Sequence, residues 1–105
     1  MAYYVVTAKP DEEQLADLRK RLKSGEIRKM RPFGEALHYS LENAKLKDDG
    51  TAIWEEEDYC RPPLAQERPA VLDEYFSQIE VEPVEEGRGW ERIQELPGMF
   101  TTLLK

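Results

Sequence analysis

The sequence predicts an α+β fold with a four-stranded antiparallel sheet, and three observations support this prediction. A strand pattern opens the chain over residues 2–8, and a capped helical pattern follows over 11–24. The pair Asp49-Gly50 then separates two further candidate strands. A second helical pattern and a last short strand complete the order β-α-β-β-α-β.

The first strand, AYYVVTA, combines aromatic and β-branched residues, which favour strands. Tyr3 and Val5 point to one face of the predicted sheet, and Tyr4 and Val6 point to the other. Both faces of this strand are therefore apolar. A strand that is apolar on both faces is expected at the centre of a sheet that is covered on each side.

The first helix is predicted from its caps and its apolar period. Asp11 stands at the N-cap position, and Leu15, Leu18 and Leu22 repeat at helical spacing. Gly25 follows directly as a helix terminator. Acidic residues open this helix and basic residues close it, which is the order that the helix macrodipole favours.

The second and third strands are predicted on either side of the Asp49-Gly50 turn. Leu37, Tyr39 and Leu41 alternate with other residues, as on a strand. The Asp-Gly pair is a strong hairpin signal, so this strand pairs antiparallel with the strand that begins AIWEEED. Depending on loop length, either Glu56 or Glu57 would face Glu42.

The second half of the chain predicts a helix, an edge strand and a short helical tail. Pro69 suits the first turn of a helix, and Pro83 places the strand QIEVEPVEE at a sheet edge. The apolar stripe of the helix consists of Val71, Leu72, Tyr75, Phe76 and Ile79. In the tail, we expect Trp90, Ile93 and Phe100 to pack on the body.

The order β-α-β-β-α-β is similar to the ferredoxin-like split βαβ arrangement. This resemblance implies the strand order 4-1-3-2 with both helices on one face. The apolar second face of the first strand then needs a cover, for which the candidates are the C-terminal extension, a second subunit or a ligand. The layout also resembles dimeric α+β barrels in outline, and we expect a homodimer.

Length and composition restrict the class of protein. The 105 residues form one domain, 1–105, whose C-terminal extension, 85–105, is expected to pack on the body or on a partner. No apolar stretch is long enough to span a membrane, and no N-terminal secretory signal is visible. Because the chain has a single cysteine, we expect a reducing, cytoplasmic location.

The net charge of −7 is distributed unevenly along the chain. Residues 19–31 contain seven basic residues and one acid, and Arg28, Lys29 and Arg31 lie beyond the first helix. These three residues are candidates for an interaction surface. An acidic third strand argues against nucleic-acid binding. One cysteine and one histidine are too few ligands for zinc, so we expect neither a metal nor a cofactor.

Four consecutive acidic residues end the third strand. We expect them to be solvated, because runs of charge usually face water and protect strand edges. The alternative is a contact surface for a basic partner, such as residues 28–31 of a second copy. The residues of this candidate surface are Glu42, Glu55, Glu56, Glu57 and Asp58.

His38 is the only histidine and the only candidate acid or base near neutral pH. On the predicted second strand it would lie on the sheet face away from the helices, with Tyr4, Ser40 and Trp54 as neighbours. These four residues are the candidate ligand-binding set.

Cys60 follows the acidic run, whose carboxylates disfavour a thiolate, so it is interpreted as a structural thiol.

The sequence therefore predicts a small acidic interaction module that self-associates or binds a further protein partner. The alternative is a small dimeric α+β-barrel enzyme or ligand binder with a cleft on the open sheet face. In that alternative His38 would be the catalytic residue. No motif in the chain fixes a reaction.

Overall fold

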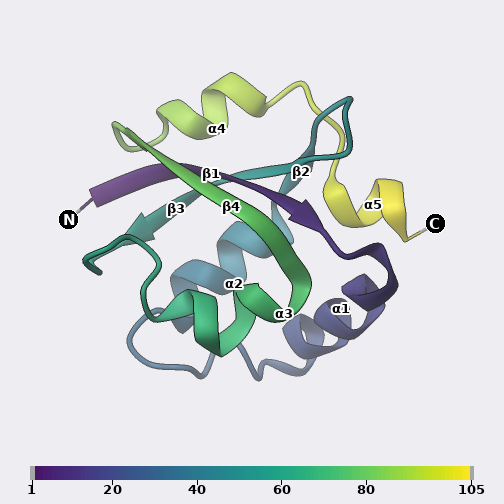
Figure 1. Cartoon of the computed structure of the whole chain (residues 1–105), viewed down its shortest axis with the longest axis horizontal. Coiled ribbons are helices and arrows are strands. Elements are labelled where there is room, and N and C mark those ends of the chain that lie inside the picture. Colours follow the sequence, from purple (N-terminus) through teal and green to yellow (C-terminus); the bar gives the residue numbers. More distant parts are fainter. Residues whose placement is uncertain (1, 105) are drawn as a thin grey trace.

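The computed structural model describes residues 2–104, which form one antiparallel sheet with helices around it (Figure 1). The elements are β1 (Ala2–Pro10), the 3₁₀ turn η1 (Glu12–Gln14), α1 (Leu15–Ser24), α2 (Gly34–Glu42), β2 (Lys45–Leu46), β3 (Ala52–Asp58), the π-helical turn η2 (Arg68–Leu72), α3 (Asp73–Tyr75), β4 (Phe76–Val84), α4 (Arg88–Ile93) and α5 (Met99–Leu103). The strand order is β2-β3-β1-β4. This order confirms the predicted α+β class and the predicted strand order 4-1-3-2.

No helix within residues 2–104 combines the length and apolarity that crossing a membrane requires.

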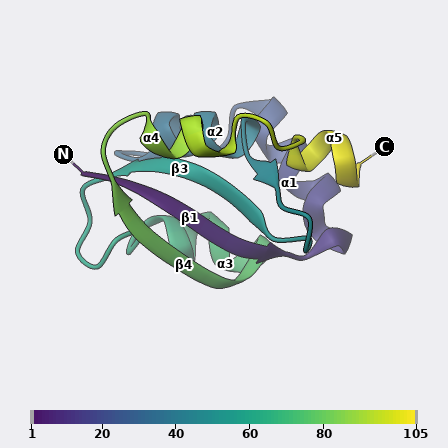
Figure 2. The same ribbon diagram turned by 90° about the horizontal axis from the view of Figure 1, so that it is seen from above.

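The first strand is central, as predicted. β1 pairs with β3 on one side and β4 on the other, and the three strands run side by side in Figure 2. Val6 is fully buried and Val5 is 5% exposed, although the two side chains point to opposite faces. The sheet is therefore covered on both sides along the middle of β1.

The cover on the Val5 face is α4. A Cβ atom added to Gly89 would lie 2.8 Å from Val5 Cγ2, so the helix backbone rests directly on this side chain. Figure 1 shows α4 above the sheet, with α1, α2 and α3 below it. The segment after β4 thus shields the face of β1 that α1 and α3 leave open.

The first helix begins and ends where the sequence predicts. The Asp11 carboxylate accepts the Glu13 N–H at 3.2 Å, and Gly25 closes the helix with φ of +83°. Leu15, Leu18 and Leu22 are buried in the core. The Asp11 cap and the spacing of the leucines therefore predict this helix correctly.

The predicted second strand is wrong over most of its length, because residues 34–42 form α2. Leu37 and Leu41 are one helical turn apart and both are fully buried, whereas Tyr39 is 60% exposed. The true β2 is only Lys45–Leu46. Beyond it, α2 borders the edge of β3, and Ser40 Oγ donates a hydrogen bond to the Glu55 carbonyl at 2.7 Å.

The hairpin at Asp49-Gly50 is confirmed, and residues 48–50 form its loop. Lys45 pairs with Ile53, and the Lys47 N–H donates to the Thr51 carbonyl at 2.8 Å. Because Glu42 belongs to α2, it faces no carboxylate of β3 across a strand ladder. The predicted pairing of Glu42 with Glu56 or Glu57 is therefore not formed.

The second helix is shorter than predicted. Val71, Leu72 and Tyr75 of η2 and α3 are buried, and the backbone becomes extended at Phe76. Phe76 consequently belongs to β4 and not to the helical stripe. β4 lies at the sheet edge, as Pro83 indicates.

Candidate binding cleft and buried acidic cluster

The acidic run at the end of β3 is mostly buried, which corrects the expectation that water surrounds it. The exposed fraction is 4% for Glu55, 0% for Glu56 and 3% for Asp58, and Glu57 is half-buried. β3 stays paired with β1 to its last residue. Strand alternation places Glu55 and Glu57 on the α4 face and Glu56 and Asp58 on the opposite face.

Glu55 holds the start of α4. Its carboxylate accepts three backbone N–H groups, from Gly87 at 2.9 Å, Gly89 at 2.8 Å and Trp90 at 3.2 Å. The first N–H groups of a helix have no partner within the helix, so an external carboxylate satisfies them and also suits the helix dipole. Glu55 therefore fixes α4 to the sheet.

A cleft of about 470 Å³ opens beside Glu55, between the ends of β1 and β3, α2 and the start of α4. We call it the acidic cleft. Among residues 2–104, its lining consists of Tyr3, Glu35, Ala36, Tyr39, Ser40, Glu55, Glu57, Glu86, Gly87 and Trp90. They include three aromatic rings and four glutamates but no lysine, arginine or histidine.

Two of the aromatic rings form a corner of the cleft. Tyr39 on α2 meets Trp90 on α4 edge to face, with ring centroids 6.0 Å apart and an angle of 88° between their planes. Tyr39 is nevertheless 60% exposed. A tyrosine so exposed contributes little to the core and leaves its ring available to a ligand.

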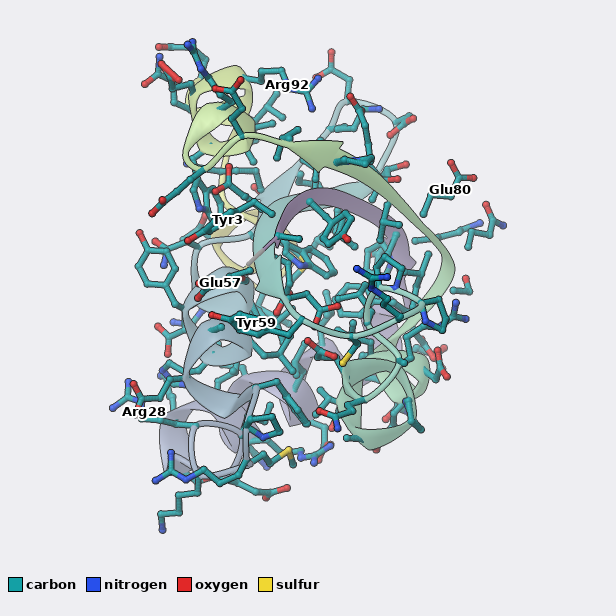
Figure 3. All side chains as sticks on the ribbon, turned by 90° about the vertical axis from the view of Figure 1, so that its left-hand side faces the viewer. Tyr3, Arg28, Glu57, Tyr59, Glu80 and Arg92 are labelled. Atoms are coloured by element: carbon teal, nitrogen blue, oxygen red, sulfur yellow. The ribbon has the colours of Figure 1, made fainter. Side chains whose placement is uncertain are left out.

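Two tyrosine hydroxyls hold Glu57 at the other end of the cleft. Tyr3 donates to Glu57 Oε2 at 3.2 Å, and Tyr59 donates to the same oxygen at 3.1 Å. Figure 3 shows these three labelled side chains on one side of the molecule. Partial burial and the hydrogen bond to Glu57 raise the pKa of Tyr3 to about 12, so Tyr3 stays a donor at neutral pH.

A second group of acids lies on the opposite face of β3. The indole N–H of Trp54 donates to Glu56 Oε1 at 3.0 Å, whereas Glu56 Oε2 has no hydrogen-bond partner within residues 2–104. Burial raises the pKa of Glu56 well above its usual value, and the negative charges of Glu67 and Asp58 act in the same direction.

Asp58, Cys60 and Glu67 form the centre of this group, with one potential ligand atom from each lying within 4.8 Å of the others. Cys60 Sγ donates to Glu67 Oε1 at 3.8 Å, and Asp58 Oδ2 accepts the Leu64 N–H at 2.5 Å. Glu67 is fully buried. Burial and the neighbouring Asp58 carboxylate raise the pKa of Glu67 to about 7.

His38 lies on α2 and not on a strand, so its predicted position on the open sheet face is wrong. Its Nε2 contacts Arg28 Nη2 at 2.8 Å and Glu42 Oε1 at 3.2 Å. The side chain is nearly buried, and it is not among the residues that line the acidic cleft. These contacts place the ring between a guanidinium and a carboxylate.

The structure does not gather the predicted ligand-binding set around one cleft. Trp54 is fully buried and packs on Phe76 with ring centroids 5.2 Å apart. Tyr4 packs against the core on the same face as Trp54. Ser40 is the member of the set that reaches the acidic cleft.

The predicted basic surface remains exposed at Arg28, Lys29 and Arg31. Arg31 also lines a smaller cleft of about 250 Å³ that reaches Asp58 and Cys60. Acidic and basic surfaces thus adjoin each other near the start of α2.

Comparison of the chain with protein-family models, with characterised proteins and with solved structures gave no match. The site therefore has to be interpreted from its own residues. Sequence reasoning missed its aromatic members and also Glu67. Tyr39 was detectable, because it falls on the polar side of the helical pattern over 34–42, whereas no local pattern marks Glu67 as buried.

Proposed function

We propose that this protein is a binding module whose acidic cleft holds an arginine or lysine side chain of a basic protein segment. The observation that supports this proposal is the composition of the cleft lining, in which the described residues provide three aromatic side chains, four glutamates and no basic side chain. A cation is the ligand that both kinds of residue attract. We place this function in the cytoplasm, where the single cysteine stays reduced.

The charges and rings of the cleft favour a planar cation such as guanidinium. Glu55 already accepts three backbone N–H groups, which leaves Glu57 and the exposed Glu35 and Glu86 as the carboxylates for a ligand. A guanidinium can pair with a carboxylate through two N–H groups and also stack on an aromatic face such as that of Tyr39. A cleft of about 470 Å³ lies within the range of small ligand sites.

Calorimetric titration with an arginine-containing basic peptide tests the proposal. We expect saturable binding that weakens as salt is added, because the interaction is largely between charges. A matched peptide with citrulline in place of arginine keeps the shape and loses the charge. We expect it to bind at least about tenfold more weakly, a difference of about 1.4 kcal/mol. Equal affinity for the two peptides would contradict the proposal.

Variants at exposed positions localise the binding to the cleft without disturbing the core. Tyr39→Ala removes a ring that contributes about 0.5–2 kcal/mol to cation binding, so we expect roughly 2- to 30-fold weaker affinity. Glu86→Gln removes one cleft charge and should also weaken binding. The control is Glu80→Gln, which makes the same charge change on β4, away from Tyr3 and Glu57 in Figure 3. If Glu80→Gln weakens binding as much as Glu86→Gln, the attraction is nonspecific.

A second copy of the chain is one source of the basic segment, since Arg28, Lys29 and Arg31 are exposed. We expect the protein to form dimers at low ionic strength that dissociate as salt rises, and light scattering measures this directly. Replacing the three basic residues by glutamine should abolish the dimer. A monomer mass at every ionic strength would show that self-association does not occur.

A further inference from the structure

The cluster of Asp58, Cys60 and Glu67 has the dimensions of a metal site. Its three potential ligand atoms lie within 4.8 Å of one another, and Cys60 Sγ is 3.8 Å from Glu67 Oε1. Tetrahedral zinc with one sulfur and one oxygen ligand holds these two atoms about 3.6 Å apart, given the usual bond lengths. Cys60 and Glu67 thus already have nearly the separation that coordination of one ion requires.

Unpaired oxygen atoms inside the protein mark places where the buried carboxyl groups can take up a proton or a cation. Glu67 and Glu56 are both fully buried, and Oε2 of each has no hydrogen-bond partner within residues 2–104. None of the ion pairs within residues 2–104 involves Glu56, Asp58 or Glu67. Burying ionised carboxylates without a partner is costly, and either protonation or coordination of a metal ion removes that cost.

We propose that Asp58, Cys60 and Glu67 bind a divalent cation of the zinc class. The cleft of about 250 Å³ that Asp58 and Cys60 line gives the ion a path from solvent. A water molecule that enters by the same cleft would be the fourth ligand. This inference goes beyond the proposed function and departs from the expectation that the chain binds no metal.

The ligand set selects among cations. Zn²⁺ and Co²⁺ accept thiolate, imidazole and carboxylate ligands, whereas Mg²⁺ and Ca²⁺ prefer oxygen alone and would gain little from Cys60. Coordination requires the thiolate form, so binding releases the Cys60 proton to solvent. We therefore expect tight binding of Zn²⁺ and Co²⁺ and none of Mg²⁺ at comparable concentrations.

Titration of the full chain with Co²⁺ tests the proposal, because cobalt bound to a thiolate has a charge-transfer absorption band. Cys60 is the only cysteine, so such a band reports on this position alone. We expect the band to saturate at one equivalent of Co²⁺ and to disappear when Zn²⁺ is added. Absence of the band at excess Co²⁺ would overturn the proposal.

Variants distinguish a site with three protein ligands from a metal ion that the Cys60 thiol binds alone. Glu67→Gln and Asp58→Asn should each weaken Co²⁺ binding at least about tenfold, since even outer-shell partners of a metal matter by that factor. Glu80→Gln, at an exposed position of β4 that does not line this cleft, is the control and should leave the affinity unchanged. If Glu67→Gln and Asp58→Asn bind as tightly as the wild type, the site does not exist.

A measurement on the unmodified protein covers the case in which a variant fails to fold. Cys60 is partly accessible and can be alkylated. One equivalent of Zn²⁺ should slow this alkylation at least about tenfold, in proportion to the fraction of thiol that is coordinated. Equal alkylation rates with and without Zn²⁺ would overturn the proposal independently of any variant.

Discussion

Replacing Glu55 by alanine is expected to lower the free energy of unfolding by about 3 kcal/mol, because it leaves three backbone N–H groups of the α4 start without an acceptor. The N–H of Gly89 is buried and cannot turn to water, whereas the other two are partly accessible. We expect α4 to loosen from Val5 as a result. Urea denaturation followed by circular dichroism measures the loss.

The adjacent acid on the same face of β3 provides the control. Glu57→Ala removes an acceptor of two tyrosine hydroxyls that can turn to solvent, so we expect a loss below about 1 kcal/mol. Glu55→Gln keeps one carbonyl acceptor and should lie between the two alanine variants. Equal stability of Glu55→Ala and Glu57→Ala would refute the role of Glu55 as the anchor of α4.

Gly34→Ala is expected to destabilise the protein by about 3 kcal/mol, the upper end of the usual cost of overpacking. A Cβ atom at this position would meet the Ile27 carbonyl oxygen and lie 2.6 Å from the Arg28 carbonyl oxygen. Both atoms belong to the backbone and cannot rotate away. The preceding loop or α2 itself would have to move.

The sign of this effect is the test, since helix propensity alone predicts that alanine stabilises a helix by about 1 kcal/mol over glycine. Glu35→Ala, at the exposed neighbouring position of α2, should change stability by less than about 0.5 kcal/mol. Thermal denaturation of the two variants at equal concentration compares them. An unchanged or higher midpoint for Gly34→Ala would contradict the close approach of α2 to residues 27 and 28.

Local sequence signals predicted the elements whose evidence lies within a few residues. Asp11, the leucine period and Gly25 delimit α1, and the Asp49-Gly50 pair sets the hairpin. The two apolar faces of β1 predicted its central position, because a strand of this kind has to be covered twice. These features depend on backbone preference and side-chain period.

The structure of residues 34–42 was ambiguous in the sequence. Leu37, Tyr39 and Leu41 alternate like a strand, while Leu37 and Leu41 are also spaced like one face of a helix. Burial of both leucines with Tyr39 exposed satisfies the helical period alone. The choice depended on contacts with the core, which a short stretch of sequence does not contain.

The acidic run marks the clearest limit of the sequence. By itself, the sequence determined that four acids end β3 and that alternate members point to opposite faces. Only the tertiary structure decided that Glu55 meets the start of α4 and that Asp58 meets Glu67. These partners lie far along the chain, and a carboxylate becomes buried only where folding brings it a donor, a proton or a cation.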